Sequence, residues 1–261
     1  MADRDLVRRA CATAFGFAAL GGERFEAHAA AFIRSEIAPT RHDANHVGLV
    51  RTSGADEIEA LLAYARSSYA GPNRPRFDLD ALTPPQVAAR LILEGFSSEE
   101  FLYLILEGDL RARRKPAVDI REVTTDADWQ AYIDLDLIWW QDLAWTRDAD
   151  LVEQNYAFER LKMPAARYWC AYLAGAPRAF LAAWRGENGV GMIEYLFTHP
   201  DYRHRGLATA LIAHCVADVR KRGAGPIVIG TEVGDTPKRM YAALGFRPLM
   251  VNRVYFPPAG V

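Results

Sequence analysis

The sequence predicts an α/β protein with a mixed α+β sheet in two domains. Its 261 residues are 51% apolar and 25% charged, which is usual for folded domains. Short apolar runs of strand length alternate with amphipathic helical patterns, most regularly in the second half of the chain. Between the halves, the basic stretch 111–116 ends in proline and has the composition of a linker. We therefore expect a smaller α+β domain at 1–112 and a larger domain at 117–261.

The first domain is predicted to begin with a helix, because Leu6, Val7 and Ala10 start an apolar face at helical spacing that Gly21 ends. Apolar residues that alternate or cluster in short runs predict strands, and helical stripes bounded by proline and glycine predict two more helices. The expected order is extended segments at 25–37 and 46–52, a helix at 58–69, a strand near Phe77, a helix at 83–95 and a strand at 101–106.

The second domain repeats this alternation of strands and helices. Leu207, Leu211 and Cys215 belong to the apolar stripe of a helix at 206–222. Pro237 and Gly245 bound a short helix at 237–244. The other expected elements are strands at 118–123, 192–198 and 227–230, a helix at 126–140, a hairpin of 169–173 with 179–184, and an extended segment at 247–256.

Charge and cysteine usage argue against several classes of protein. The 31 Lys and Arg against 33 Asp and Glu give a net charge of -2 and no general attraction to nucleic acid. The stretch 111–115 is interpreted as a solvated linker, with a phosphate or nucleic-acid contact as the alternative. Cys11, Cys170 and Cys215 lie far apart and predict neither disulfides nor a metal site. The apolar run 10–20 favours an amphipathic helix over a signal peptide, so we expect a cytoplasmic protein with no membrane partner.

Two motifs in the second domain carry chemical information. The first, between a predicted strand and a predicted helix, is Arg203-His204-Arg205-Gly206-Leu207-Ala208. The free N–H groups and the dipole at a helix start attract phosphate, and arginine adds charge-assisted hydrogen bonds to phosphate oxygens. The second motif, 35 residues after Gly206, begins with Tyr241 and reads Tyr241-Ala242-Ala243-Leu244-Gly245-Phe246.

The paired motifs resemble the Gcn5-related N-acetyltransferase family (GNAT), over about residues 117–256. The first motif matches the family's acyl-CoA pyrophosphate loop, and the second matches its later Tyr-x-x-Leu-Gly-Phe motif. The resemblance implies the GNAT fold, in which two central strands of a mixed sheet splay apart, here 192–198 and 227–230. Pantetheine would lie in the gap like an extra strand. The implied cosubstrate is acetyl-CoA, and no metal is required.

The resemblance also implies roles for individual residues. The residues implied in cofactor binding are Leu196, Phe197 and Thr198 through their backbone, and Arg203, His204, Arg205, Gly206, Leu207 and Ala208 in the loop. Tyr241 would be the general acid that protonates the departing thiolate, with a core aromatic as the alternative. Many family members carry asparagine seven residues before this tyrosine. Here the residue is Gly234, so the resemblance does not extend to that contact.

Glu194 is the best-placed general base in the sequence, because it lies on the strand that leads into the loop. Burial beside an apolar sheet raises a carboxyl pKa into a useful range. The alternative is a solvated or ion-paired carboxylate on the strand face. Glu232 and Asp235 are further candidates, although Asp235 also fits the cap of the next helix. His199 and His204 are interpreted as surface residues of the loop rather than metal ligands.

The first domain shares only part of this pattern. Its predicted helix ends in Gly95-Phe96 as the later one ends in Gly245-Phe246, but Leu91 stands opposite Tyr241. No Arg-x-x-Gly-x-Ala loop precedes the linker. We interpret residues 1–112 as a degenerate, non-catalytic and truncated acetyltransferase-like half that covers the second domain or shapes its acceptor pocket, with an unrelated α+β domain as the alternative.

These inferences predict an acetyl-CoA-dependent N-acetyltransferase. It would transfer an acetyl group directly to a primary amine of a small molecule or peptide. A non-catalytic acyl-CoA-binding or regulatory protein is the alternative from another class, and a nucleic-acid-binding module that uses 111–115 is a second one. The sequence leaves the identity of the amine and the formation of a homodimer open.

Overall fold

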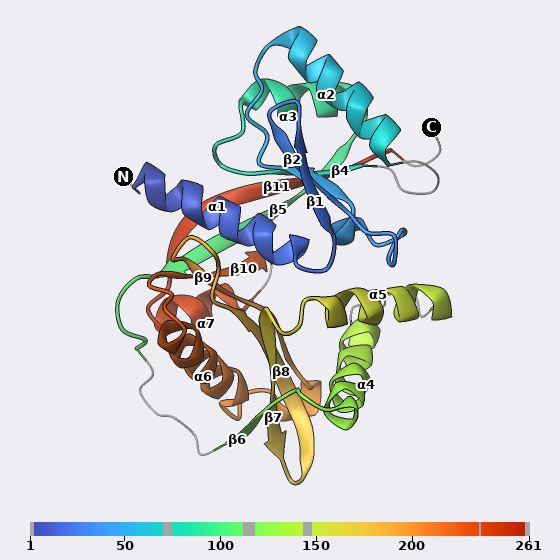
Figure 1. Ribbon diagram of the computed structural model, residues 1–261. Helices are drawn as coiled ribbons and strands as arrows, with labels where there is room; N and C mark the ends of the chain where they lie inside the picture. Colours follow the sequence, from blue (N-terminus) through green and yellow to red (C-terminus); the bar gives the residue numbers. More distant parts are fainter. Residues whose placement is uncertain (1–2, 70–74, 112–117, 143–147, 235, 259–261) are drawn as a thin grey trace.

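One continuous sheet runs through the molecule. The computed structural model describes residues 3–69, 75–111, 118–142, 148–234 and 236–258. Within them, an 11-stranded sheet has the order β1-β2-β3-β4-β11-β5-β10-β9-β8-β7-β6 (Figure 1). Strands alternate with helices along the chain, so the mixed α/β class that the sequence predicts is confirmed.

The elements follow the predicted order with two differences. The first part contains α1 (Arg4–Ala19), β1 (Glu23–Ala27), β2 (Ala30–Arg34), the 3-10 turn η1 (His42–Ala44), β3 (His46–Gly48), α2 (Ala55–Ser68), β4 (Arg76–Leu79), α3 (Pro85–Leu93) and β5 (Ser97–Leu106). The extended segment expected at 25–37 is a hairpin, because His28 and Ala29 form a tight turn with φ values of 50° and 53°.

The second part adds a helix that the sequence analysis did not predict. Its elements are β6 (Asp119–Glu122), α4 (Asp126–Asp142), α5 (Ala149–Leu161), β7 (Ala166–Leu173), β8 (Ala176–Trp184), β9 (Gly191–Thr198), the 3-10 turn η2 (Pro200–Tyr202), α6 (Leu207–Lys221), β10 (Ile227–Glu232), α7 (Lys238–Ala243) and β11 (Arg247–Phe256). The unpredicted helix is α5. Its buried Tyr156 and Phe158 are two positions apart, which hides the helical period.

The two halves repeat one order of elements. β3-α2-β4-α3-β5 in the first half corresponds to β9-α6-β10-α7-β11 in the second. β3 pairs with β4 in parallel over three residues, and β9 pairs with β10 in the same way. After α3 and α7, Gly95 and Gly245 take φ values of 83° and 101°. This repeat fits the interpretation of the first half as a shorter copy of the second.

The last strand of each half lies in the sheet of the other. β5 pairs with β10, β11 pairs with β4, and β5 and β11 pair with each other from Ser97 and Phe256 to Ile105 and Arg247. A strand of residues 1–112 is therefore part of the sheet around the second-half motifs. The division at 112–117 into two folding domains stays a prediction, and residues 112–117 lie outside the described part of the chain.

Helices cover both faces of the sheet. α6 and α7 pack on one face of the second-half strands, and α4 lies on the other (Figure 1). α1 lies across that second face where the halves meet, with Cys11 Sγ 3.4 Å from Met250 Sδ on β11. Val228 faces α1, whereas Ile229 faces α6, so strand β10 is apolar on both sides. No helix in the described segments is long and apolar enough to cross a membrane.

Candidate functional site

A gap opens between strands β9 and β10. Their parallel pairing consists of three residue pairs and ends at Ile193 with Ile229. Beyond this point β9 continues to Thr198 along β8, while β10 follows β5, with Gly230 opposite Tyr103. The two central strands therefore part beyond this pair, as the resemblance implies, and Leu196, Phe197 and Thr198 lie on the part of β9 that no longer pairs with β10.

The loop after β9 prepares an anion site at the start of α6. Gly206 is the N-cap of α6 with φ of 84°, and the helix has no side-chain cap. The first bond within the helix runs from Ala210 N to Gly206 O at 3.0 Å. The N–H groups of Leu207, Ala208 and Thr209 consequently keep the orientation that binds phosphate at helix starts. Leu207 is buried, so only its backbone is available to a ligand.

The arginines of the loop are exposed and anchored by the backbone. Arg203 Nε donates to Thr198 O at 3.2 Å, and Arg205 Nη2 donates to Asp201 O at 3.3 Å. Two guanidinium groups lie against the Tyr202 ring, with the Arg178 Cζ atom 4.3 Å and the Arg205 Cζ atom 5.1 Å from the ring centre. His204 is exposed, with φ of 63°. The loop thus presents positive charge beside the open helix N-terminus.

Glu194 lies at the point where the strands separate. A Cβ atom on Gly230 would stand 3.2 Å from Glu194 Oε2 and 3.3 Å from Tyr103 Cε1, so glycine leaves room here for both side chains. Burial raises the pKa of Glu194 to about 7, against hydrogen bonds from the backbone N–H groups of Tyr195 and Gly230 that lower it. A carboxyl group with this pKa exchanges protons near neutral pH, as a general base must.

Tyr241 is buried in the apolar cluster under α6 and α7. Its side chain is 3% exposed, and its ring centre lies 6.2 Å from that of Phe246. Leu207 and Ile229 belong to the same cluster, so Tyr241 lies on the α6 face of the sheet. Glu194 faces the opposite side, as its neighbour Tyr103 shows. This placement separates the candidate acid from the candidate base by the thickness of the sheet.

The other candidate residues lie near the end of β10 and in the loop. Glu232 is exposed at the end of β10, and a side chain at Gly234 would meet no atom within 4 Å. His199 Nδ1 accepts from Asp201 N at 3.2 Å and caps η2. Asp235 lies outside the described residues, as does most of the stretch 111–115. In the segments that the structure describes, no three His, Cys, Asp or Glu side chains converge on a metal position.

Several charged groups near β9 have no signal in the sequence. Glu159, in the last turn of the unpredicted helix α5, and Lys162, directly after this helix, are buried beside Tyr195. Tyr103 comes from the first half of the chain. Burial raises the pKa of Asp136 on α4 to about 7, although Tyr156 donates to it at 2.8 Å. These residues meet through tertiary packing, so a search by motif spacing misses them.

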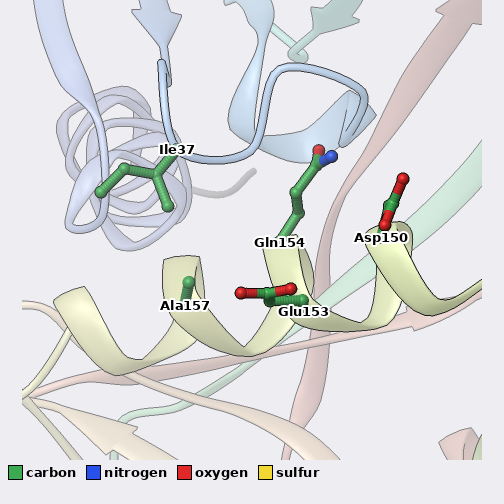
Figure 2. Close-up of a pocket in the computed structure, with 5 residues that line it drawn as sticks. All are labelled: Ile37, Asp150, Glu153, Gln154 and Ala157. Atoms are coloured by element: carbon green, nitrogen blue, oxygen red, sulfur yellow. The ribbon is translucent and has the colours of Figure 1, made fainter.

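A groove separates α5 from the loop after β2. Its volume is about 250 Å³, and it is lined by Ile37, Asp150, Glu153, Gln154 and Ala157. Figure 2 shows Gln154 reaching from α5 toward the loop, where the Thr40 hydroxyl donates to its side-chain oxygen at 2.8 Å. None of the candidate residues above lines the groove, so it is separate from the gap between β9 and β10.

Comparison with known proteins relates this geometry to a family. Residues 129–246 match the model of the acetyltransferase (GNAT) family. A Gcn5-related N-acetyltransferase from Kribbella flavida has a similar structure, with 17% identity, coverage of 98% of this chain and 96% of that one, and a TM-score of 0.74. A tandem GNAT protein from the clavulanic acid biosynthesis pathway has 18% identity, coverage of 80% and 74%, and a TM-score of 0.60. No curated protein matches the sequence.

Proposed function

We propose that this chain is an acetyl-CoA-dependent N-acetyltransferase, because residues 129–246 match the model of the acetyltransferase (GNAT) family. It transfers an acetyl group directly to a primary amine of a small molecule or peptide. The observation that carries the proposal is the combination of an uncapped helix N-terminus behind Gly206 with a strand gap that has Glu194 at its apex. The first feature suits a pyrophosphate, and the second suits an extended chain beside a proton acceptor.

The chain's own residues divide the binding of acetyl-CoA between loop and strand. The N–H groups at the start of α6 and the guanidinium groups of Arg203 and Arg205 hold the pyrophosphate. The free edge of β9 at Leu196–Thr198 bonds the pantetheine arm as a neighbouring strand would. This fixes the thioester near the apex of the gap, and orientation of this kind lowers the barrier to transfer.

The proton transfers are assigned to two side chains. Glu194 takes a proton from the ammonium form of the acceptor, directly or through a water molecule. The neutral amine nitrogen then bonds to the thioester carbonyl carbon, and the carbon–sulfur bond breaks. As this bond breaks, Tyr241 donates its hydroxyl proton to the departing thiolate. The nitrogen of the new amide gives up its second proton, which restores the Tyr241 hydroxyl through water. The acceptor side is formed by both halves, because Tyr103 of β5 lies beside Glu194.

Two measurements on the full chain test this function. Acetyl-CoA at about 100 times its dissociation constant should stabilise the fold by about 2.7 kcal/mol, visible as a higher Tm. A panel of primary amines should then contain acceptors that release CoA thiol at a saturable rate. An unchanged Tm at every acetyl-CoA concentration contradicts the proposal. Binding without thiol release from any amine supports the acyl-CoA-binding alternative instead.

A further inference from the structure

A cluster of buried charges lies beside strand β9. Lys162, directly after α5, has a side chain that is 0% exposed. Its ammonium donates to Glu159 Oε1 at 3.0 Å and to the Tyr195 hydroxyl at 2.7 Å. It also lies 5.0 Å from the ring centres of Phe17 and Phe158 and 4.9 Å from that of Tyr195. A buried ammonium is costly unless it is paired, so these contacts hold Lys162 in one position.

The same cluster extends into the first half of the chain. Glu159 accepts from the Tyr168 hydroxyl at 2.6 Å and also pairs with Arg41, which precedes η1. Arg41 Nη2 in turn lies 2.7 Å from Asp43 Oδ2. With Lys162 protonated, two cations balance two carboxylates. Burial alone would raise the pKa of Glu159, but Arg41 and Lys162 hold it below its usual value. The first half therefore fixes the position of Lys162 through Glu159.

Tyr195 is the bulged residue of β9. The pairing of β8 with β9 shifts between Phe180 and Ala182, so that Tyr195 and Leu196 oppose the single residue Leu181. Tyr195 has φ of 63°, a conformation that bulky side chains rarely adopt and that persists only where the surroundings enforce it. The bond from Lys162 and the packing of the Tyr195 ring are such surroundings.

The bulge sets how the Glu194 carboxylate is presented. Glu194 directly precedes Tyr195 and pairs with Ala182 at the edge of the bulge, and the backbone N–H of Tyr195 lowers the pKa of Glu194 against its burial. Lys162, directly after α5, lowers the pKa of Glu194, and the Glu194 carboxylate raises the pKa values of its neighbours Tyr195 on β9 and Tyr103 on β5. A change in the backbone of Tyr195 would therefore change the direction of the Glu194 side chain and the backbone N–H group that favours its carboxylate.

We propose that Lys162 is a positioning residue: through Tyr195 it fixes the bulge that presents the Glu194 carboxylate, and through Glu159 and Arg41 it makes that geometry depend on the first half. The proposal rests on the proposed function, because the direction of Glu194 matters only if the acceptor amine loses its proton there. It gives the degenerate half a role in the reaction without a ligand site of its own.

The first test compares Lys162→Met with Arg160→Met, using kcat/KM as a function of pH. Both variants remove one cation from the end of α5, but Arg160 is exposed and pairs with Asp126. Lys162→Met should lower kcat about 10- to 100-fold. It should also move the acid limb about 1 pH unit upward, because the lost cation favoured the Glu194 carboxylate. The affinity for acetyl-CoA and all properties of Arg160→Met should stay unchanged. If Lys162→Met lowers kcat/KM by the same factor at every pH, the proposal is contradicted.

Tyr195→Phe carries the test if Lys162→Met does not fold. It keeps the ring, whose centre lies 5.5 Å from that of Phe17, and removes only the hydroxyl that accepts from Lys162. We expect kcat to fall about 3- to 10-fold with the KM for acetyl-CoA unchanged. A wild-type kcat in this variant overturns the proposal.

A titration without substrates separates this inference from the proposed function. The ¹³C carboxyl signal of Glu194, identified by its loss in Glu194→Gln, is followed against pH in wild type, Lys162→Met and Tyr195→Phe. If no amine is acetylated by wild type but the Glu194 pKa rises in Lys162→Met, the proposed function fails and the coupling stands. If amines are acetylated and the Glu194 titration is the same in all three proteins, the inference fails alone.

Discussion

The β3–α2 turn of the first half and the β9–α6 turn of the second have the same place in the repeated fold but opposite chemistry. Gly54 and Gly206 are the N-caps of the two helices. At α2, the Glu57 carboxylate turns back and accepts from Gly54 N at 3.2 Å and the Thr52 hydroxyl at 2.7 Å. At α6 no side chain caps the helix. At the start of α2 a carboxylate of the chain itself thus accepts from the N-cap N–H, whereas the start of α6 has no such carboxylate and is open to a ligand's anion.

The strands before these helices also differ, in how far each continues beyond its parallel partner. β3 ends at Gly48, the last residue of its pairing with β4, whereas β9 runs from its last pair at Ile193 on to Thr198. The first half therefore has neither a strand edge for a pantetheine arm nor an open anion site. The difference teaches that the same order of elements can place different groups at the helix start, so under the proposed function a few residues at one turn decide which half binds acetyl-CoA.

The largest effect is expected when the open turn is given an anion of its own. Gly206→Asp places a carboxylate at the N-cap, where it takes up the N–H groups and repels pyrophosphate, so acetyl-CoA should no longer raise the Tm at all. Gly206→Asn is the matched control, because asparagine tolerates φ of 84° as well as aspartate does and carries no charge. It should bind acetyl-CoA more weakly than wild type but measurably. Wild-type affinity in Gly206→Asp would show that the pyrophosphate binds elsewhere.

A smaller loss is expected when the loop is left intact and the base is removed. Glu194→Gln keeps the shape of the side chain, so acetyl-CoA affinity should be unchanged while kcat falls about 10³-fold. In wild type, kcat/KM should rise as pH increases through about 7, because burial raises the pKa of Glu194 to that value and only the carboxylate takes a proton. Glu194→Gln should lose this rise of kcat/KM with pH.

Asp136→Asn is the control for this prediction. Burial raises the pKa of Asp136 to about 7 as well, but its side chain is 5% exposed and bonds to Tyr156 inside the α4 layer. Its turnover should stay within a few-fold of wild type. Equal losses of kcat in Glu194→Gln and Asp136→Asn would mean that any buried carboxyl with a pKa of about 7 has this effect. The position of Glu194 at the gap would then not explain it.

Tyr241→Phe tests the other place where the halves differ, since Leu91 occupies the corresponding position of the first half. Phe96 N donates to Leu91 O and Phe246 N donates to Tyr241 O, each at 3.0 Å, so the two helices end with the same hydrogen bond. Phenylalanine keeps the packing and removes the donor. Steady-state CoA release should fall about 10²-fold if the hydroxyl is the acid. Tyr255→Phe, at a buried tyrosine of the first-half cluster, should leave turnover unchanged. Near-equal turnover in both variants would assign Tyr241 to the core alone.

The comparison also explains how far sequence reasoning reaches. The loop 203–208, its helix and the diverging strands follow one another within the chain, so residue spacing and the family resemblance predicted them together. The surroundings of Glu194 could not be predicted in this way. Lys162, Tyr103 and Arg41 come from three elements distant in sequence, and the exchange of β5 and β11 brings Tyr103 to the gap. Helix α5, which positions Lys162, lacks a readable period because a buried charge replaces part of its apolar stripe.

The smallest effect is expected at the closed turn, in Glu57→Gln. Hydrogen bonds from Thr52 and from the backbone of Gly54 and Ser53 hold the pKa of Glu57 below its usual value. A lowered pKa means that the carboxylate stabilises the fold above the pKa of the unfolded chain and that this contribution disappears as pH falls through the folded value. Glu57→Gln should therefore lower the Tm by about 1 to 3 °C at pH 7, and this difference should disappear as pH falls through the lowered pKa of Glu57 in the folded state.

Asp56→Asn separates the cap from the helix dipole, since it removes a charge from the same first turn without a bond to Thr52 or Gly54. It should cost less than Glu57→Gln at pH 7. Acetyl-CoA should stabilise Glu57→Gln as much as wild type, because opening the start of α2 supplies neither the arginines nor the strand edge that accompany Gly206. A second equivalent of acetyl-CoA bound by Glu57→Gln would show instead that a single carboxylate is all that keeps the first half from binding the cofactor.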